Sequence, residues 1–300
     1  MNRVTIRVPA KLNLGLEVLR RRDDGYHDLA TIFQAIDLYD EFTVEPADEL
    51  EYRGDPRIPP DIDIARRAFL EIGSERSWTG RITVHKQIPI AGGLGGGSSD
   101  AALALRLAAL DDSHFDALTR ARAFGADVPF FLHGGTALGR GIGDRLEPLP
   151  TPAWWFVIVV PELRIERKTA TLFSRLTPDD FSSGGRVEAL AARLRSGSPE
   201  LPAELPNAFA RQVFSYPRAA ALSDLLRDVT GRVALSGAGP SLFSWHAAAD
   251  EAQQLARDLR ERASAPVYLA RALGQGGDER ALGAFLRVLK ASGGRGTNGQ

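Results

Sequence analysis

A run of glycines in the first third of the chain constrains its fold more than any other feature. Five of the six positions from Gly92 to Gly97 are glycine, and a serine pair and an apolar segment follow directly. Glycine has no Cβ, so such a run adopts positive φ angles and lets a ligand approach the backbone closely. Consecutive amides arranged in this way form an anion-binding nest. The sequence therefore predicts a cradle for polyphosphate. Its predicted members are Pro89, Ile90, Ala91, Gly92, Gly93, Leu94, Gly95, Gly96, Gly97, Ser98 and Ser99.

The segments on either side of the glycines favour a folded loop over the alternative, a flexible linker. Gly80–Lys86 alternates apolar and polar residues, which predicts a strand. Ala101–Leu110 predicts a helix, with Ser98 or Ser99 as its N-cap. The free N–H groups and the positive end of that helix would add to an anion site.

Two common nucleotide-binding loops are excluded. The chain contains no Gly-Lys-[Ser/Thr], so the glycine run is not a P-loop. The third glycine position of the dinucleotide fingerprint is filled by Ser98.

Composition excludes several further classes of protein and of site. Three hundred residues suit one large domain or two moderate ones. The 37 basic and 38 acidic residues nearly cancel, so no nucleic-acid partner is expected. The absence of cysteine excludes disulfides, thiolate metal sites and cysteine nucleophiles. No His-x-x-x-His spacing and no Gly-x-Ser-x-Gly element is present, so the histidines beyond position 80 are read as structural.

No membrane partner is expected from the sequence either. The longest apolar run, Ala153–Val160, is far too short to span a bilayer. The N-terminus lacks the apolar core of a signal peptide, which makes the cytoplasm the expected location. Monomer and homodimer both remain open.

The first twenty residues predict two strands separated by a proline. Val4–Val8 alternates with polar residues, Pro9 is expected to end that strand, and Leu12–Val18 alternates again. The period of two places Lys11 and Asn13 side by side on one face. A polar turn ending in Asp-Gly follows, and then two strands over Leu29–Ile36 and Asp37–Glu45.

Four further segments, taken with the glycine run, resemble the GHMP kinases and in particular their CDP-methylerythritol kinase branch. They are Pro-Ala-Lys-Leu-Asn-Leu at 9–14, Asp-Gly-Tyr-His-Asp-Leu at 24–29, Gly-Ala-Asp-Val-Pro-Phe-Phe at 125–131 and Leu-Ser-Gly-Ala-Gly-Pro-Ser at 235–241. The resemblance extends from Pro9 to about Arg271. All the segments occur in the family's order.

The resemblance implies an α+β, two-domain GHMP kinase fold. It comprises a ribosomal protein S5 domain 2-like N-terminal domain over 1–150 and a ferredoxin-like C-terminal domain over 151–272. The residues themselves predict a split βαβ arrangement in the second half. A Gly-rich tail, 273–300, is expected to be partly disordered, with one short helix near Leu282–Lys290.

The resemblance also implies an ATP-dependent kinase that uses Mg²⁺ and phosphorylates the 2-hydroxyl of a cytidine diphosphate-linked polyol in isoprenoid biosynthesis. Its catalytic residues would be Lys11 and Asp127. By residue type alone, Asp127 fits a helix N-cap equally well, and Lys11 fits a solvated strand lysine.

Substrate-binding residues follow from the same resemblance: Asn13, Tyr26, His27 and Gly237. Tyr26 and His27 would hold the cytosine, whereas the residues alone favour a packed tyrosine beside an exposed histidine. No metal ligand is assigned, and Ser99 and Asp100 are the nearest candidates for Mg²⁺.

Three positions depart from the family pattern: Asp63, Lys168 and Ala208. Two alternatives therefore stay open. One is a sister kinase with another small acceptor, such as homoserine or a mevalonate derivative. The other is a catalytically silent nucleotide-binding module.

Overall fold

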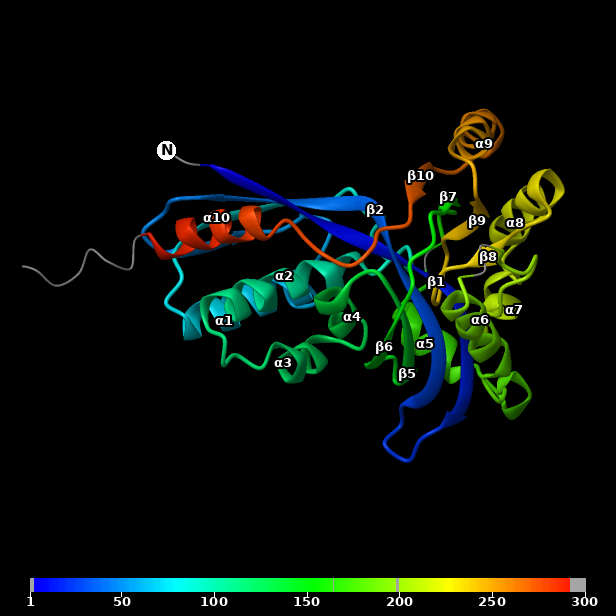
Figure 1. Ribbon diagram of the computed structural model, residues 1–300, viewed down its shortest axis with the longest axis horizontal. Helices are drawn as coiled ribbons and strands as arrows, with labels where there is room; N and C mark the ends of the chain where they lie inside the picture. The colour runs from blue at the N-terminus through cyan, green and yellow to red at the C-terminus, as the bar shows by residue number, and fades with distance from the viewer. Residues whose placement is uncertain (1–2, 164, 198–199, 292–300) are drawn as a thin grey trace, which may run out of the picture.

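A long antiparallel hairpin of β1 (Val4–Arg21) and β2 (His27–Glu45) contacts both halves of the molecule (Figure 1). The structure, a computed structural model, describes residues 3–163, 165–197 and 200–291. The prediction that Pro9 ends the first strand is wrong. The pairing register shifts between Pro9 and Ala10, and such an irregularity accommodates a residue without an N–H group. The two strands expected between residues 29 and 45 are likewise one, β2.

The first sheet has six strands in the described part of the chain, in the order β3-β4-β2-β5-β6, with β1 paired to β2. Its further strands are β3 (Leu50–Arg53), β4 (Gly80–His85), β5 (Thr136–Gly141) and β6 (Arg145–Leu149). β3 and β4 run parallel, and the other neighbours are antiparallel.

Three helices pack on this sheet and share one hydrophobic core with it: α1 (Ile64–Glu75), α2 (Gly96–Asp111) and α10 (Glu279–Lys290). The side chains of Phe69, Leu103 and Phe285, one from each helix, are buried in that core. α10 is the short helix expected in the tail, and it lies beside the first sheet although it follows the second in sequence (Figure 1). The tail's expected disordered end, 292–300, lies outside the described residues.

Two shorter helices, α3 (Ala117–Phe124) and α4 (Val128–His133), complete this half. Asp116 caps α3 by accepting a hydrogen bond from the Thr119 amide. α4 follows three residues after α3 and begins at the predicted position, after Asp127.

The second sheet has the order β10-β7-β9-β8, with every neighbouring pair antiparallel. Its strands are β7 (Trp155–Val159), β8 (Ala234–Leu235), β9 (Leu242–His246) and β10 (Val267–Arg271). The first and second strands in sequence are thus parallel with the third between them, which is the predicted split βαβ arrangement.

The remaining helices belong to the second half of the chain (Figure 1). They are α5 (Lys168–Ser174), α6 (Gly185–Arg195), α7 (Ala210–Val213), α8 (Pro217–Thr230) and α9 (Ala249–Arg262), with a 3₁₀ turn at Pro178–Asp180. Within the described ranges, none of the helices combines the length and hydropathy that crossing a bilayer requires.

Candidate functional site

The glycine run forms a tight loop between β4 and α2. Helix α2 begins after Gly95, which has φ 74° and no capping side chain. The prediction of Ser98 or Ser99 as N-cap is therefore wrong, because the left-handed turn at Gly95 starts the helix earlier. The Ser99 amide donates to the Gly95 carbonyl, so the helical amides before it have no intrahelical acceptor. They are free to bind an anion.

Four consecutive carbonyls of this loop are held by donors from other parts of the chain. The Ala91 carbonyl accepts from Lys168, and the Gly92 carbonyl accepts from the Ser241 amide. The Gly93 carbonyl accepts from the Lys11 ammonium, and the Leu94 carbonyl from the Lys11 amide. The N–H group across a planar trans peptide points away from the carbonyl before it. Tying the carbonyls of Gly92, Gly93 and Leu94 inward therefore turns the amides that follow them outward, as an anion nest requires, whereas the Gly92 amide donates to the Pro89 carbonyl at 3.1 Å.

Glycine is required at Gly93 because another chain segment touches it. Its φ is +83°, and a Cβ there would lie 2.5 Å from the Ser236 carbonyl oxygen and 2.7 Å from that of Gly239. Such close packing against the second half of the chain is incompatible with the flexible-linker alternative.

Gly93→Ala is expected to destabilise the protein and weaken its affinity for ATP. A left-handed alanine costs about 1–2 kcal/mol before the clash is counted. Thermal unfolding should show the loss, and equilibrium ATP binding should weaken with it. Gly283→Ala is the matched control, because a Cβ on that α10 residue meets only the Arg287 side chain at 3.6 Å. Equal Tm values for the two variants would contradict this packing.

A buried ion cluster directly behind the loop was not anticipated from the sequence. The Lys86 ammonium pairs with Asp40 and, at 2.5 Å, with Asp100, the fifth residue of α2. Asp40 also accepts hydrogen bonds from the amides of Gln87 and Ile88, at 2.6 and 2.9 Å. Burial raises the pKa of the Asp100 carboxyl well above its usual range, against the attraction of Lys86. The cluster fixes the chain entering the loop to the helix leaving it.

Lys11, Asn13 and Asp127 lie together beside the loop. The Lys11 ammonium donates to Asn13 Oδ1 at 2.6 Å and to the Gly93 carbonyl at 3.1 Å, and lies 3.4 Å from Asp127 Oδ2. Asn13 in turn donates to the Thr31 hydroxyl at 2.8 Å, which fixes its amide. The Lys11 side chain is 4% exposed, so the solvated-lysine alternative is wrong.

Asp127 occupies the N-cap position of α4, but its side chain makes no capping hydrogen bond. Its backbone there is helical, at φ −86° and ψ −12°, rather than extended as a capping residue's usually is. The carboxylate is 35% exposed and is directed at Lys11. It is therefore both accessible and available for chemistry.

The second half of the chain reaches this cluster through the loop 236–240. The Ser236 hydroxyl donates to the Gly93 carbonyl at 3.0 Å. A Cβ on Gly237 would lie 3.0 Å from Asn13 Oδ1 and 3.3 Å from the Lys11 ammonium, so only glycine fits there. Asn207 holds the loop by donating to the carbonyls of Leu235 and Gly237, both at 2.9 Å.

Tyr26 and His27 lie apart from that cluster, at the tip of the β1–β2 hairpin. Tyr26 is 59% exposed, whereas the His27 ring packs against Phe173 of α5 and against Phe181, with centroid distances of 5.0 and 6.0 Å. This reverses the alternative of a packed tyrosine beside an exposed histidine. Burial lowers the pKa of His27, with Arg21 contributing, which favours a neutral imidazole. Nothing in the local sequence predicts that Phe173 and Phe181 contact His27.

No group of three or more metal-ligating His, Cys, Asp or Glu side chains occurs in the described residues. Of the two candidates named for Mg²⁺, Asp100 is occupied by Lys86 inside the protein and fits a metal ligand poorly. The Ser99 hydroxyl, one turn into α2, is buried and has no hydrogen-bond partner within the described part of the chain. Asp100 Oδ1 is likewise buried without a partner there, but the charge of its carboxyl group is already paired with Lys86, which leaves Ser99 as the better candidate.

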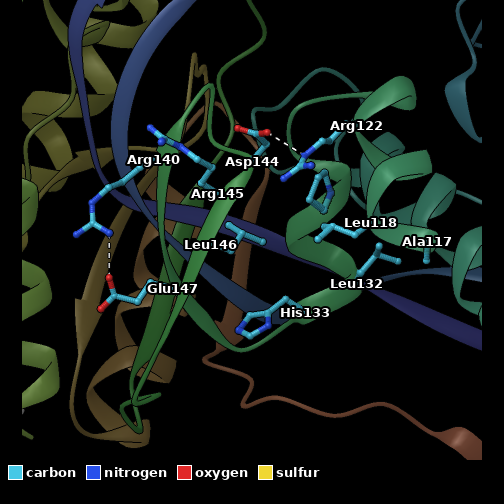
Figure 2. A pocket seen from close by; sticks show the side chains of 11 residues that line it. Ala117, Leu118, Arg122, Leu132, His133, Arg140, Asp144, Arg145, Leu146 and Glu147 are labelled. Carbon is cyan, nitrogen blue, oxygen red and sulfur yellow. Dashed lines mark hydrogen bonds and ion pairs between the residues drawn. The ribbon is translucent and has the colours of Figure 1, made fainter.

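The cavity in Figure 2 is separate from this site. It has a volume of about 740 Å³ and lies between α3, α4 and the β5–β6 hairpin. Ion pairs between Arg122 and Asp144 and between Arg140 and Glu147 flank it, as the dashed lines show. Neither Lys11 nor Asp127 nor the glycine loop lines it.

Comparison with known proteins matches the loop and most of the chain. The family model described as GHMP kinases N terminal domain matches residues 63–135, which include the glycine loop and Asp127. The 4-diphosphocytidyl-2-C-methyl-D-erythritol kinase of Thermus thermophilus is 37% identical over 265 residues, which cover 84% of this chain and 91% of that protein. The protein of the same name from Dehalococcoides mccartyi is 34% identical, covering 90% of this chain and 99% of that protein.

Solved structures agree with these relatives. A crystal structure of 4-(cytidine 5'-diphospho)-2C-methyl-D-erythritol kinase superposes with a TM-score of 0.76 at 35% identity, covering 91% of this chain and 100% of that chain. Homoserine kinase from Cytophaga hutchinsonii superposes with a TM-score of 0.67 at 16% identity, covering 92% and 96%. The second likeness concerns the fold alone.

Proposed function

Because the chain belongs to the GHMP kinases, in the 4-diphosphocytidyl-2-C-methyl-D-erythritol kinase family, we propose that it phosphorylates the 2-hydroxyl of that cytidine diphosphate-linked polyol with ATP. The reaction belongs to the non-mevalonate route to isoprenoid precursors. The observation that carries the proposal is the Lys11–Asp127 pair set beside an outward-facing phosphate loop.

Asp127 is the proposed general base. As the acceptor hydroxyl oxygen bonds to the γ-phosphorus, the bond between that phosphorus and the β–γ bridging oxygen breaks, and ADP leaves. The hydroxyl proton passes to the Asp127 carboxylate, which no capping hydrogen bond occupies. The products are ADP and a phosphate monoester. Phosphoryl transfer depends mainly on positioning and charge stabilisation, so the base must be held in place.

Lys11 is the proposed electrostatic partner. Its ammonium is fixed by Asn13 and the Gly93 carbonyl, so its charge is oriented before the substrates bind. Preorganised charge of this kind stabilises the transferring phosphoryl group at no reorganisation cost.

Mg²⁺ is the proposed companion of ATP, since it binds oxygen ligands and commonly coordinates phosphates with few protein groups. When bound, it would neutralise charge on the phosphate chain. Ser99 is the residue of this chain proposed to face it, because its buried hydroxyl has no hydrogen-bond partner among the described residues and, unlike the Asp100 carboxylate, is not paired with Lys86.

The placement of Tyr26 and His27 fits an acceptor that is long. Helix α5 connects the two regions: Lys168 touches the glycine loop, and Phe173 touches His27. Five residues of helix separate those contacts by about 8 Å. A diphosphate linker between a base and a polyol spans such a distance, whereas a small acceptor such as homoserine does not.

Tyr26→Ala is expected to weaken acceptor binding by about 1–3 kcal/mol, because an exposed aromatic face stacks on a nucleobase. The KM for the acceptor should rise, with the KM for ATP and the Tm little changed, since the ring is 59% exposed. Tyr26→Phe keeps the ring and should behave as wild type. An acceptor KM unaffected by the alanine would show that Tyr26 does not bind the acceptor.

The reaction itself is tested by identifying the product. Incubation with ATP, Mg²⁺ and the cytidine compound should yield a monophosphate ester at the tertiary 2-hydroxyl, as ³¹P NMR and mass spectrometry would establish. Phosphorylation at another hydroxyl would contradict the proposed orientation of the acceptor. A domain boundary near residue 150, a cytoplasmic location and a monomeric or homodimeric state remain predictions from the sequence.

A further inference from the structure

Lys168 is the one family-pattern departure that lies directly on the phosphate loop. It opens α5 in the second half of the chain, and its ammonium donates to the Ala91 carbonyl at 2.5 Å and to the Gly239 carbonyl. It therefore ties the loop of the first half to the loop 236–240 of the second. One ammonium group thus hydrogen-bonds to two segments that are distant in the sequence.

The residue that Lys168 holds is a strained one. Ala91 has φ 57°, a left-handed conformation that residues with a Cβ adopt at a cost. Strain of this kind persists only where the surroundings enforce it. The lysine supplies such enforcement by holding the carbonyl of Ala91, directly before the glycine run.

The charge of Lys168 lacks a counter-ion. No carboxylate pairs with it among the residues that the structure describes, and both acceptors are neutral carbonyls. Burial, together with the nearby charge of Lys11, lowers the pKa of Lys168 to about 8. A partly desolvated ammonium without a counter-ion is stabilised when an anion binds beside it.

We propose that Lys168 is a further ATP-binding residue of this kinase: its protonated ammonium holds the phosphate loop in its binding conformation and supplies positive charge to the polyphosphate. The inference rests on the proposed function, since it concerns the same phosphate site. Loss of the proton removes the charge and weakens the clamp, because a neutral amine is a poorer hydrogen-bond donor than an ammonium.

ATP affinity should therefore depend on pH through this group. Polyphosphate binding raises the pKa of Lys168, so ATP binds the protonated form more tightly, and its affinity falls as the pH rises through about 8. The surrounding elements offer few other titratable groups. Lys11 of β1 faces Lys168, and Asp127 of α4 lies beyond it at 3.4 Å from Lys11. The phosphate loop 89–97 and the loop 236–241 contain none.

The experiment is equilibrium binding of ATP, AMP and the cytidine acceptor, each measured separately by calorimetry between pH 7 and 9.5. Lys168→Met should bind ATP about tenfold more weakly at pH 7 and lose most of the fall above pH 8, while AMP binding is unchanged. Lys168→Arg, which keeps the charge but does not titrate in this range, should stay near wild type at pH 7 and lose the pH dependence. Lys290→Met, which removes an equal charge from the exposed end of α10, is the matched control.

Three results would overturn the proposal. One is ATP binding by Lys168→Met that equals the Lys290→Met control at every pH. Another is equal weakening of ATP and AMP, which would make the residue purely structural. The third is a loss confined to the cytidine acceptor, which would assign the charge to that substrate's diphosphate. Product formation by the wild type at pH 7 tests the proposed function separately, so the two ideas fail independently.

Discussion

Asp127→Asn is expected to lower kcat by about 100- to 10,000-fold, the usual contribution of a general base. The asparagine keeps the shape of the side chain but does not accept the acceptor's proton. ATP affinity should stay close to wild type, because Asp127 touches Lys11 rather than the phosphate loop. The fold should also survive, since the carboxylate caps no amide of α4. Steady-state kinetics and ATP binding on the same preparation measure both quantities.

The matched control is Asp224→Asn, which neutralises an exposed carboxylate that pairs with Arg227 on α8. Exposed pairs of this kind contribute little, so kcat and Tm should both remain at the wild-type value. Ordinary turnover by Asp127→Asn would remove Asp127 from the role of base. It would leave the carboxylate as a partner that only positions Lys11.

Lys86→Met is expected to cause the largest loss of stability, about 3–5 kcal/mol, because removing one partner of a buried ion cluster leaves the others uncompensated. Asp40 and Asp100 would both remain inside the protein without a counter-charge. Asp40 also holds the amides of Gln87 and Ile88, so the entry to the phosphate loop should loosen. Urea unfolding gives the free energy directly.

The control is again Lys290→Met, whose ammonium pairs with Asp111 at the exposed end of α10. Its loss should cost no more than about 1 kcal/mol. If the two methionine variants unfold at the same urea concentration, the cluster around Lys86 does not support the loop. Other contacts would then have to hold the phosphate loop in place.

Local sequence predicted the parts of the site that are local in the chain. The glycine run was identifiable because glycine adopts positive φ angles freely, as Gly93 and Gly95 do in the structure. The neighbouring positions of Lys11 and Asn13 follow from strand alternation, and the structure joins their side chains at 2.6 Å. The approach of Lys11 to Asp127 came from family resemblance, because nothing in the spacing of the two residues implies it. The structure brings them together, while their roles remain predictions.

Contacts between distant segments were not predictable in this way. The cluster of Asp40, Lys86 and Asp100 joins three separate segments of the chain. No local sequence pattern marks any of the three residues as a member of a buried ion cluster. The packing of His27 against Phe173 likewise depends on where α5 lies. Helix α2 starts early because one left-handed glycine outweighs two favourable capping serines. In each case tertiary structure overrides a local preference.

ADP release from ATP and Mg²⁺ should be measured with three acceptors side by side: the cytidine diphosphate-linked methylerythritol, homoserine and mevalonate. We expect turnover with the cytidine compound alone. Turnover with homoserine or mevalonate would show that Tyr26 and His27 do not select the acceptor. ATP binding without turnover on any of the three would contradict the kinase assignment and indicate a silent nucleotide-binding module.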